Sequence, residues 1–126
     1  VDKMLEPLMV KNRPEFLQTA PPSILGSSHD RRAGTIGRND SLTVVMLGTP
    51  HKAASFSIGN SVTQLPMNEV DTGHYVGEYF PEPVDSFSNE DVYVFLTDDY
   101  GRTSRQKVGI GPVTLAPEQV RSAKNP

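Results

Sequence analysis

DVYVFLT (residues 91–97) is the stretch of the chain that decides its fold class. A short run of β-branched and aromatic residues, followed by turn residues at Asp98–Gly101, is typical of a β-strand. Because alternate residues of a strand point to opposite faces, one face would carry Val92, Val94 and Leu96. The other face would carry Tyr93 and Phe95, which are also apolar. We expect this second face to be covered by the domain's own loops, the N-terminal segment, a neighbouring domain or an assembly partner.

Short alternating runs of the same kind occur on both sides of this stretch. The 10 glycines and 11 prolines favour turns over long helices, and no helical periodicity persists between residues 22 and 115. We expect residues 27–40 to form a polar loop. The predicted strands are residues 23–26, 42–47, 54–58, 62–67, 74–80, 91–97 and 103–110. This pattern predicts an all-β fold, an immunoglobulin-like β-sandwich of about seven strands with extended N- and C-terminal segments.

The chain divides into three parts. Residues 1–21 are predicted to be a lead-in that serves as a linker or docking segment, and residues 22–115 to form the sandwich. Residues 116–126 are polar, contain prolines and are predicted to be a C-terminal linker.

An apolar cluster in the lead-in is interrupted by prolines, which lack a backbone N–H. Its members include Met4, Leu5 and Leu8. We expect either that the lead-in folds back on its own domain or that it binds another subunit by strand addition through residues 3–10. Since the first residue is Val1, we expect a processed product, an excised module or an incomplete segment, and no signal peptide is visible.

Composition excludes several classes of function. With 12 basic and 15 acidic residues the net charge is −3, which excludes a general basic footprint for nucleic acid. No apolar run approaches the roughly 20 residues that a membrane-spanning helix needs, so no membrane insertion is expected. The chain has no cysteine, which excludes disulfides, thiolate metal sites and cysteine nucleophiles.

The pattern of polar residues does not indicate catalysis, a cofactor or a metal. A zinc site needs three or four convergent ligands, whereas the histidines are scattered: His29, His51 and His74. Paired carboxylates lie in predicted turns, where they hydrogen-bond the backbone: Glu69 with Asp71, and Asp98 with Asp99. The Ser-x-x-Lys pattern at 104–107 lies in a predicted strand, where its two ends face opposite sides. We therefore expect a protein that is not an enzyme.

Charged loops are further candidate contact surfaces. Arg31 and Arg32 lie in a basic loop that could bind an acidic partner or remain a solvated loop. The loop at residues 82–91 is acidic. Opposite charges on one small module could steer head-to-tail contact between copies or domains.

Five sequence motifs resemble those of bacterial immunoglobulin-like modules, which occur in envelope and secreted multidomain proteins. The motifs are NDSLTVVMLGTP (residues 39–50), ASFSIG (54–59), PMNE (66–69), GHYVGEY (73–79) and LTDDYGR (96–102). The chain departs from the usual pattern at His51 and Lys52, where glycines are usual, and at His74, where an apolar residue is common. The resemblance implies an exported β-sandwich, in the periplasm or at the cell surface, and no catalytic residues.

We therefore expect a non-catalytic scaffold, spacer and protein-interaction domain of a bacterial envelope or cell-surface protein. Its partners would be other proteins or neighbouring domains of the same chain. One alternative is a subunit of a larger assembly, held by strand addition through the N-terminal segment. A second is a carbohydrate-binding accessory domain whose glycan would contact exposed aromatic residues, of which the candidates are Tyr93, Phe95 and Tyr100.

Overall fold

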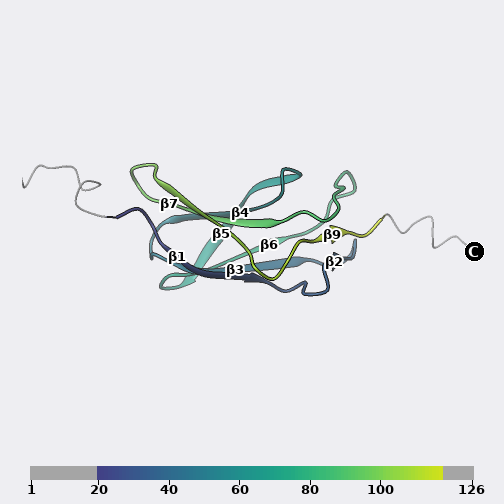
Figure 1. Ribbon diagram of the computed structural model, residues 1–126, viewed down its shortest axis with the longest axis horizontal. Helices are drawn as coiled ribbons and strands as arrows, with labels where there is room; N and C mark the ends of the chain where they lie inside the picture. Colours follow the sequence, from purple (N-terminus) through teal and green to yellow (C-terminus); the bar gives the residue numbers. More distant parts are fainter. Residues whose placement is uncertain (1–19, 118–126) are drawn as a thin grey trace, which may run out of the picture.

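The computed structural model describes residues 20–117, and within them it shows nine β-strands and no helix (Figure 1). The strands are β1 (Ile24–His29), β2 (Thr35–Ile36), β3 (Leu42–Gly48), β4 (Ala53–Ile58), β5 (Val62–Asp71), β6 (His74–Tyr79), β7 (Val92–Thr97), β8 (Thr103–Lys107) and β9 (Thr114–Leu115). The predicted all-β class is confirmed. The described residues contain no helix long and apolar enough to cross a membrane.

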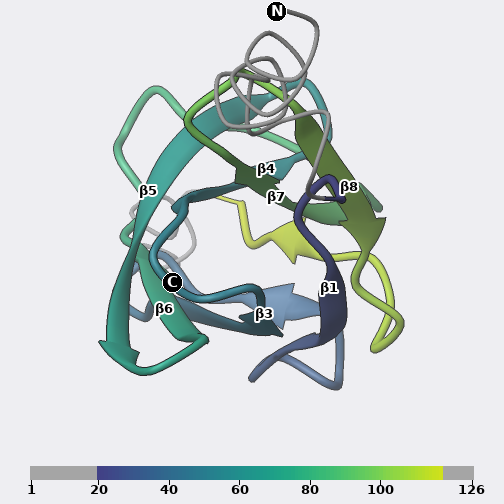
Figure 2. The same cartoon turned by 90° about the vertical axis from the view of Figure 1, so that its left-hand side faces the viewer.

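Seven strands form one antiparallel sheet in the order β1-β3-β6-β5-β4-β7-β8, and β2 pairs in parallel with β9. The long strand β5 changes neighbours along its length. Its first part, Val62–Met67, pairs with β4, and its second part, from Asn68 to Asp71, pairs with β6. The sheet therefore turns over at β5 and curls into a nearly closed barrel (Figure 2). The finer prediction of an immunoglobulin-like sandwich is not confirmed.

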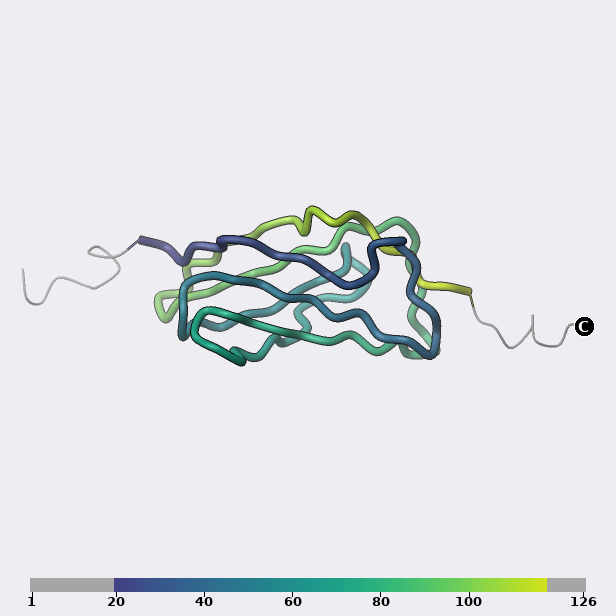
Figure 3. The backbone as a smooth tube through the Cα atoms, turned by 90° about the horizontal axis from the view of Figure 1, so that it is seen from below, coloured from purple at the N-terminus to yellow at the C-terminus, as the bar shows by residue number. Residues whose placement is uncertain are grey.

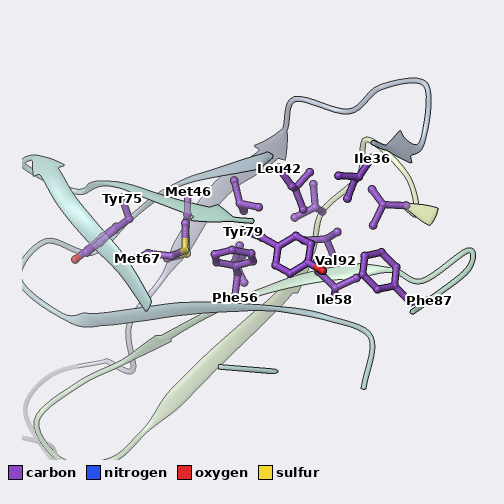
Figure 4. Close-up of a cluster of buried hydrophobic side chains, with 14 of the residues drawn as sticks. Ile36, Leu42, Met46, Phe56, Ile58, Met67, Tyr75, Tyr79, Phe87 and Val92 are labelled. Carbon is purple, nitrogen blue, oxygen red and sulfur yellow. The ribbon is translucent and has the colours of Figure 1, made fainter. Parts of the chain in front are cut away.

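Alternate residues of the strands fill the interior of the barrel (Figure 4). The inward face of β7 is the one predicted from the period-2 pattern, with Val94 fully buried at its centre. On β3 the inward residues are Leu42, Val44 and Met46. The fully buried apolar side chains include Ile36, Leu42, Val44, Met46, Phe56, Ile58, Tyr75, Val92, Val94, Leu96, Val108 and Val113.

Phe56 of β4 packs directly on the backbone of β6 at Gly77. A Cβ atom at Gly77 would lie 2.7 Å from Cε1 of Phe56 and 2.9 Å from Cγ of Met67. Gly77 lies between Tyr75 and Tyr79, and its lack of a side chain leaves the room that Phe56 and Met67 occupy.

Side chains, rather than a backbone ladder, join the two outermost strands, β1 and β8. Ser27 Oγ donates a hydrogen bond to Gln106 Oε1 at 2.6 Å, and the Ser104 hydroxyl donates to the carbonyl of Pro22. His29 is buried at the end of this seam. Its Nδ1 accepts from the Arg31 N–H at 3.1 Å, so its Nε2 carries the proton and donates to the Gly111 carbonyl at 2.8 Å.

Three predicted boundaries differ from the structure by more than one residue. Residues 27–40 were predicted to be a loop, but β1 continues to His29 and β2 lies within that range. The prediction was wrong because these residues are held by partners far away in the chain instead of by an alternating apolar pattern. Strand β5 continues past Pro66 to Asp71, and β8 ends at Lys107 instead of residue 110.

The chain enters and leaves the barrel at opposite ends of its long axis (Figures 1 and 3). We call the end that holds Ala20 and the turn at residues 98–102 the N-pole. The Arg102 guanidinium there contacts the Ala20 carbonyl, with 3.5 Å between Nη2 and O. We call the other end, with Pro117 and the loops at residues 30–41 and 80–91, the C-pole.

The Arg38 guanidinium holds the C-pole together by donating to three backbone carbonyls. The acceptors are Ala116 at 2.9 Å, Glu82 at 3.1 Å and Asp85 at 2.9 Å. The Tyr79 hydroxyl donates to the Asp85 carboxylate at 2.6 Å. Burial and this hydrogen bond to Asp85 raise the pKa of Tyr79 far above its ordinary value, so its hydroxyl stays a donor.

Replacing Gly77 with alanine should destabilise the barrel, because the added methyl group would overlap Phe56 and Met67. We expect Gly77→Ala to lower the free energy of unfolding by about 1–3 kcal/mol, measured by urea denaturation followed by circular dichroism. Gly26→Ala is the matched control, since a Cβ there would meet no atom within 4 Å. Equal effects of the two substitutions would contradict the proposed close packing.

Candidate functional site

The outer face of β4, β7 and β8 is the candidate site. Side chains that alternate with the core residues point away from the barrel here. In the strand register, Phe95 lies between Ser55 and Arg105, and Tyr93 lies between Ser57 and Lys107. An aromatic row on the middle strand is thus flanked by hydroxyl groups on β4 and by basic side chains on β8.

The β4–β5 turn and the start of β5 border this face and make it concave. Together they form an open groove of about 560 Å³, which we call the outer-face groove. Its wall includes Asn60, Thr63 and Gln64. Gln64 has a positive φ of 55°, and its backbone N–H donates to Ser57 Oγ at 3.1 Å, which holds the wall against β4.

Tyr93 and Phe95 lie at the centre of the outer-face groove, each half-buried. The guanidinium carbon of Arg105 lies 4.9 Å from the centroid of the Tyr93 ring, which is a cation–π contact. Thr97 and Thr103 close one end of the groove with a hydrogen bond of 2.7 Å between their hydroxyls. The groove therefore offers aromatic surface, one cation and several hydroxyl groups to a ligand or partner.

Two carboxylates, Glu90 and Asp91, lie at the end of the groove nearest the C-pole. Glu90 is held by an isolated antiparallel bridge to Val113, with hydrogen bonds of 2.9 Å in both directions. The Asp91 carbonyl accepts from the Gly59 N–H at 2.8 Å. Backbone contacts therefore hold this acidic end in place.

The other predicted contact residues lie outside the groove. Arg31 donates from Nε and Nη2 to the Ser41 carbonyl at 3.1 and 3.0 Å, so its guanidinium braces its own loop. Arg32 is exposed at the C-pole, on the same end of the barrel as the acidic loop. Tyr100 lies at the N-pole, and the centroid of its ring is 5.5 Å from the guanidinium carbon of Arg102. Met4, Leu5 and Leu8 lie outside the described residues.

Two carboxylates singled out in the sequence stabilise turns at the N-pole. Glu69 accepts from the Gly73 N–H at 2.7 Å and from the His51 N–H at 3.1 Å, and the Gly73 hydrogen bond is the main cause of its lowered pKa. Burial alone would raise the pKa of Asp98. Hydrogen bonds from the N–H and guanidinium of Arg102 and from the Tyr100 N–H outweigh burial, so the pKa of Asp98 is lowered.

The Ser-x-x-Lys pattern does not bring its two ends together. The Ser104 hydroxyl donates to the Pro22 carbonyl, and Lys107 points outward on the opposite face of β8. In the part of the chain that the structure describes, no group of three or more His, Asp or Glu side chains could hold a metal ion.

Sequence reasoning found Tyr93 and Phe95 but missed the residues that complete the groove around them. Ser55, Thr103 and Arg105 reach the site through the β4-β7-β8 register, which no local pattern reveals. Arg105 is exposed on β8, and alternation along one strand does not indicate which strand lies beside it.

Comparison of the chain with models of protein families, with curated proteins and with solved structures finds no match.

Acid should destabilise the N-pole because Glu69 and Asp98 have lowered pKa values in the folded state. Their stabilisation is present above the ordinary values of 4.5 and 3.8 and is lost as the pH falls through the lowered values. Asp98→Asn removes the ion pair with Arg102, so its destabilisation should be largest near neutral pH and should shrink as the pH falls below 3.8. Urea denaturation across this range measures the effect.

Asp99→Asn is the matched control for this experiment, because Asp99 is the exposed neighbour of Asp98. Its free energy of unfolding should follow the wild-type pH dependence. If the free energy of unfolding depends on pH in the same way for Asp98→Asn and Asp99→Asn, the Asp98 hydrogen bonds contribute nothing to stability.

Proposed function

We propose that this chain is a non-catalytic, immunoglobulin-like module of an exported bacterial protein. It holds neighbouring domains apart and contacts protein partners through the outer-face groove. The observation that carries this proposal is the position of the two ends of the barrel, at opposite poles of its long axis (Figure 1). A domain that the chain crosses from pole to pole adds its full length to the distance between its neighbours.

The strand order supports the immunoglobulin-like assignment. Taken in two halves, the sheet reads β1-β3-β6-β5 and β4-β7-β8. This order corresponds to the ABED and CFG sheets of constant-type immunoglobulin domains, if the strands are lettered along the chain and the short β2 is left out. The chain departs from that pattern where β5 pairs with strands of both halves.

The chemistry of the outer-face groove supports a role in protein contact. Residues that dominate binding energy at protein interfaces are enriched in Tyr and Arg and are surrounded by a polar rim. The Tyr93–Arg105 pair has hydroxyl groups on both sides, from Ser55 on β4 and Thr103 on β8. The location in the bacterial envelope rests on the resemblance of the five sequence motifs.

The spacer role is tested by joining copies of the full chain head to tail, through their own terminal segments. Small-angle X-ray scattering should show a maximum dimension that grows by a constant step with each copy. The step should be at least about 23 Å, the length of a seven-residue strand at about 3.3 Å per residue. The matched control replaces the joining segments with Gly-Ser segments of equal length. Copies that cluster, so that the dimension does not grow linearly, would overturn the spacer role.

The outer-face groove also supports a second candidate, a carbohydrate-binding accessory domain. Aromatic rings and hydroxyl groups can together contact the apolar and polar sides of a sugar. If glycans bind here, tyrosine fluorescence of the wild type should change during titration with an oligosaccharide panel. Tyr93→Ala and Phe95→Ala should then weaken binding at least about tenfold, which is about 1.4 kcal/mol. Tyr100→Ala, in the turn between β7 and β8 and outside the groove lining, should leave the affinity unchanged, and an equal loss there would contradict a site in the groove.

A further inference from the structure

The two halves of the sheet separate between β5 and β6 as they approach the C-pole. The ladder between these strands covers only Asn68–Asp71 of β5 and His74–Val76 of β6. Beyond it, β5 turns away to pair with β4 (Figure 2). Within the described residues, Gly77–Tyr79 therefore have no strand opposite them on this side, and their edge borders a cleft of about 380 Å³. We call it the β5–β6 cleft.

The β5–β6 cleft has an apolar interior and an acidic rim. Val62 and Leu65 are half-buried, and Phe80 at its mouth is 62% exposed. Glu78, Glu82 and Asp85 supply three carboxylates and no basic side chain lines the cleft. Such a cleft would bind a segment that carries both apolar and basic side chains.

Only one of the two strands at this cleft offers a usable edge. On β5, Pro66 has no N–H to donate, and the positive φ of 55° at Gln64 distorts the strand. On β6, the edge is regular from Gly77 until Pro81 ends it. An extended segment could therefore add to the β6 edge as a new strand, with main-chain hydrogen bonds along Gly77–Phe80.

The N-terminal part of the chain contains a segment with matching chemistry. Pro7 and Pro14 bracket LMVKNR (residues 8–13), in which every residue has an N–H and none is acidic. In an extended conformation Leu8 and Val10 share one face, and Lys11 and Arg13 share the other. On β6, Tyr79 faces the core and Glu78 faces outward. The apolar face would cover Val62 and Leu65 while the basic face lies beside Glu78, as a favourable cross-strand pair requires.

We propose that residues 8–13 of a second copy of this chain add to β6 in the β5–β6 cleft. The cleft lies toward the C-pole, whereas the N-terminal segment joins the barrel at the N-pole, beside Arg102. When copies are arranged head to tail, the N-pole of one copy faces the C-pole of its neighbour, and the cleft lies toward that C-pole. The proposal goes beyond the spacer function, because it names the acceptor and the donor by which copies associate, and it uses no residue of the outer-face groove.

Cysteine cross-linking tests this proposal cleanly, because the chain has no cysteine of its own. Full-length Val10→Cys is mixed with full-length Phe80→Cys, oxidised with diamide, and analysed by non-reducing electrophoresis and mass spectrometry. We expect a covalent heterodimer to form at least about tenfold faster than with Val84→Cys, as expected for an intra-complex reaction. Val84 is the matched control because it is 85% exposed on the same loop but does not line the cleft. Glu82→Cys serves as a second acceptor if replacing Phe80 disturbs the fold.

Two outcomes of the cross-linking would overturn the proposal. Equal rates with Phe80→Cys and Val84→Cys would show that the cleft is not the acceptor. If a chain carrying both Val10→Cys and Phe80→Cys links internally at high dilution while mixed single variants do not link, the occupant is the chain's own segment. In either case the scattering experiment on joined copies still decides the spacer role by itself.

A charge exchange provides a separate readout by light scattering. The wild type should exceed its monomer mass of 13.8 kDa as concentration rises. Lys11→Glu with Arg13→Glu should abolish this rise, and so should Glu78→Lys with Glu82→Lys, while a mixture of the two double variants should restore it. Failure of the mixture to associate, when both variants are folded by circular dichroism, would contradict the pairing of these charges.

Discussion

Phe56 rests directly on the backbone of Gly77, and this contact sets the separation of the two halves of the sheet. Phe56 belongs to β4 and Gly77 to β6. The distance between the two halves of the sheet is therefore set by the Phe56 ring, which packs against the Gly77 backbone. A protein interior has little free volume, so this distance cannot change without cost. Strand β5 connects the halves on the N-pole side of this contact, and on the C-pole side they diverge into the β5–β6 cleft. The β5–β6 cleft thus lies on the side of the Phe56–Gly77 contact where no strand joins the two halves.

Polar contacts between distant parts of the chain stabilise the edges and turns of the barrel, outside its apolar core. Side-chain hydrogen bonds join β1 to β8, where the backbone ladder of the sheet ends. Asp98 and Glu69 stabilise the turns of the N-pole, and Arg38 holds three carbonyls together at the C-pole. Arg38 and Glu69 do so by hydrogen-bonding backbone groups, and Asp98 bonds both the backbone and the guanidinium of Arg102.

The sequence predicted those parts of the structure that depend on local alternation. The inward face of β7, with Tyr93 and Phe95 on its other face, could be read from a period-2 pattern. The extension of β1 through Ser27 and the rim of the groove at Arg105 could not. They depend on register and on partners such as Gln106, 79 residues beyond Ser27 in the chain. Patterns within one strand carry no information about which strand lies beside it.

The positions of the two poles have a mechanical consequence. Tension passed along the chain would pull Ala20 and Pro117 apart, along the direction in which the strands run (Figure 3). The hydrogen bonds between β1 and β3 lie across that direction, so the pull would act on them in shear. Bonds loaded in shear share the force and must break together, whereas bonds pulled open from one end break one after another. Because its chain ends lie at opposite poles, the barrel would therefore resist unfolding under a force applied to those ends.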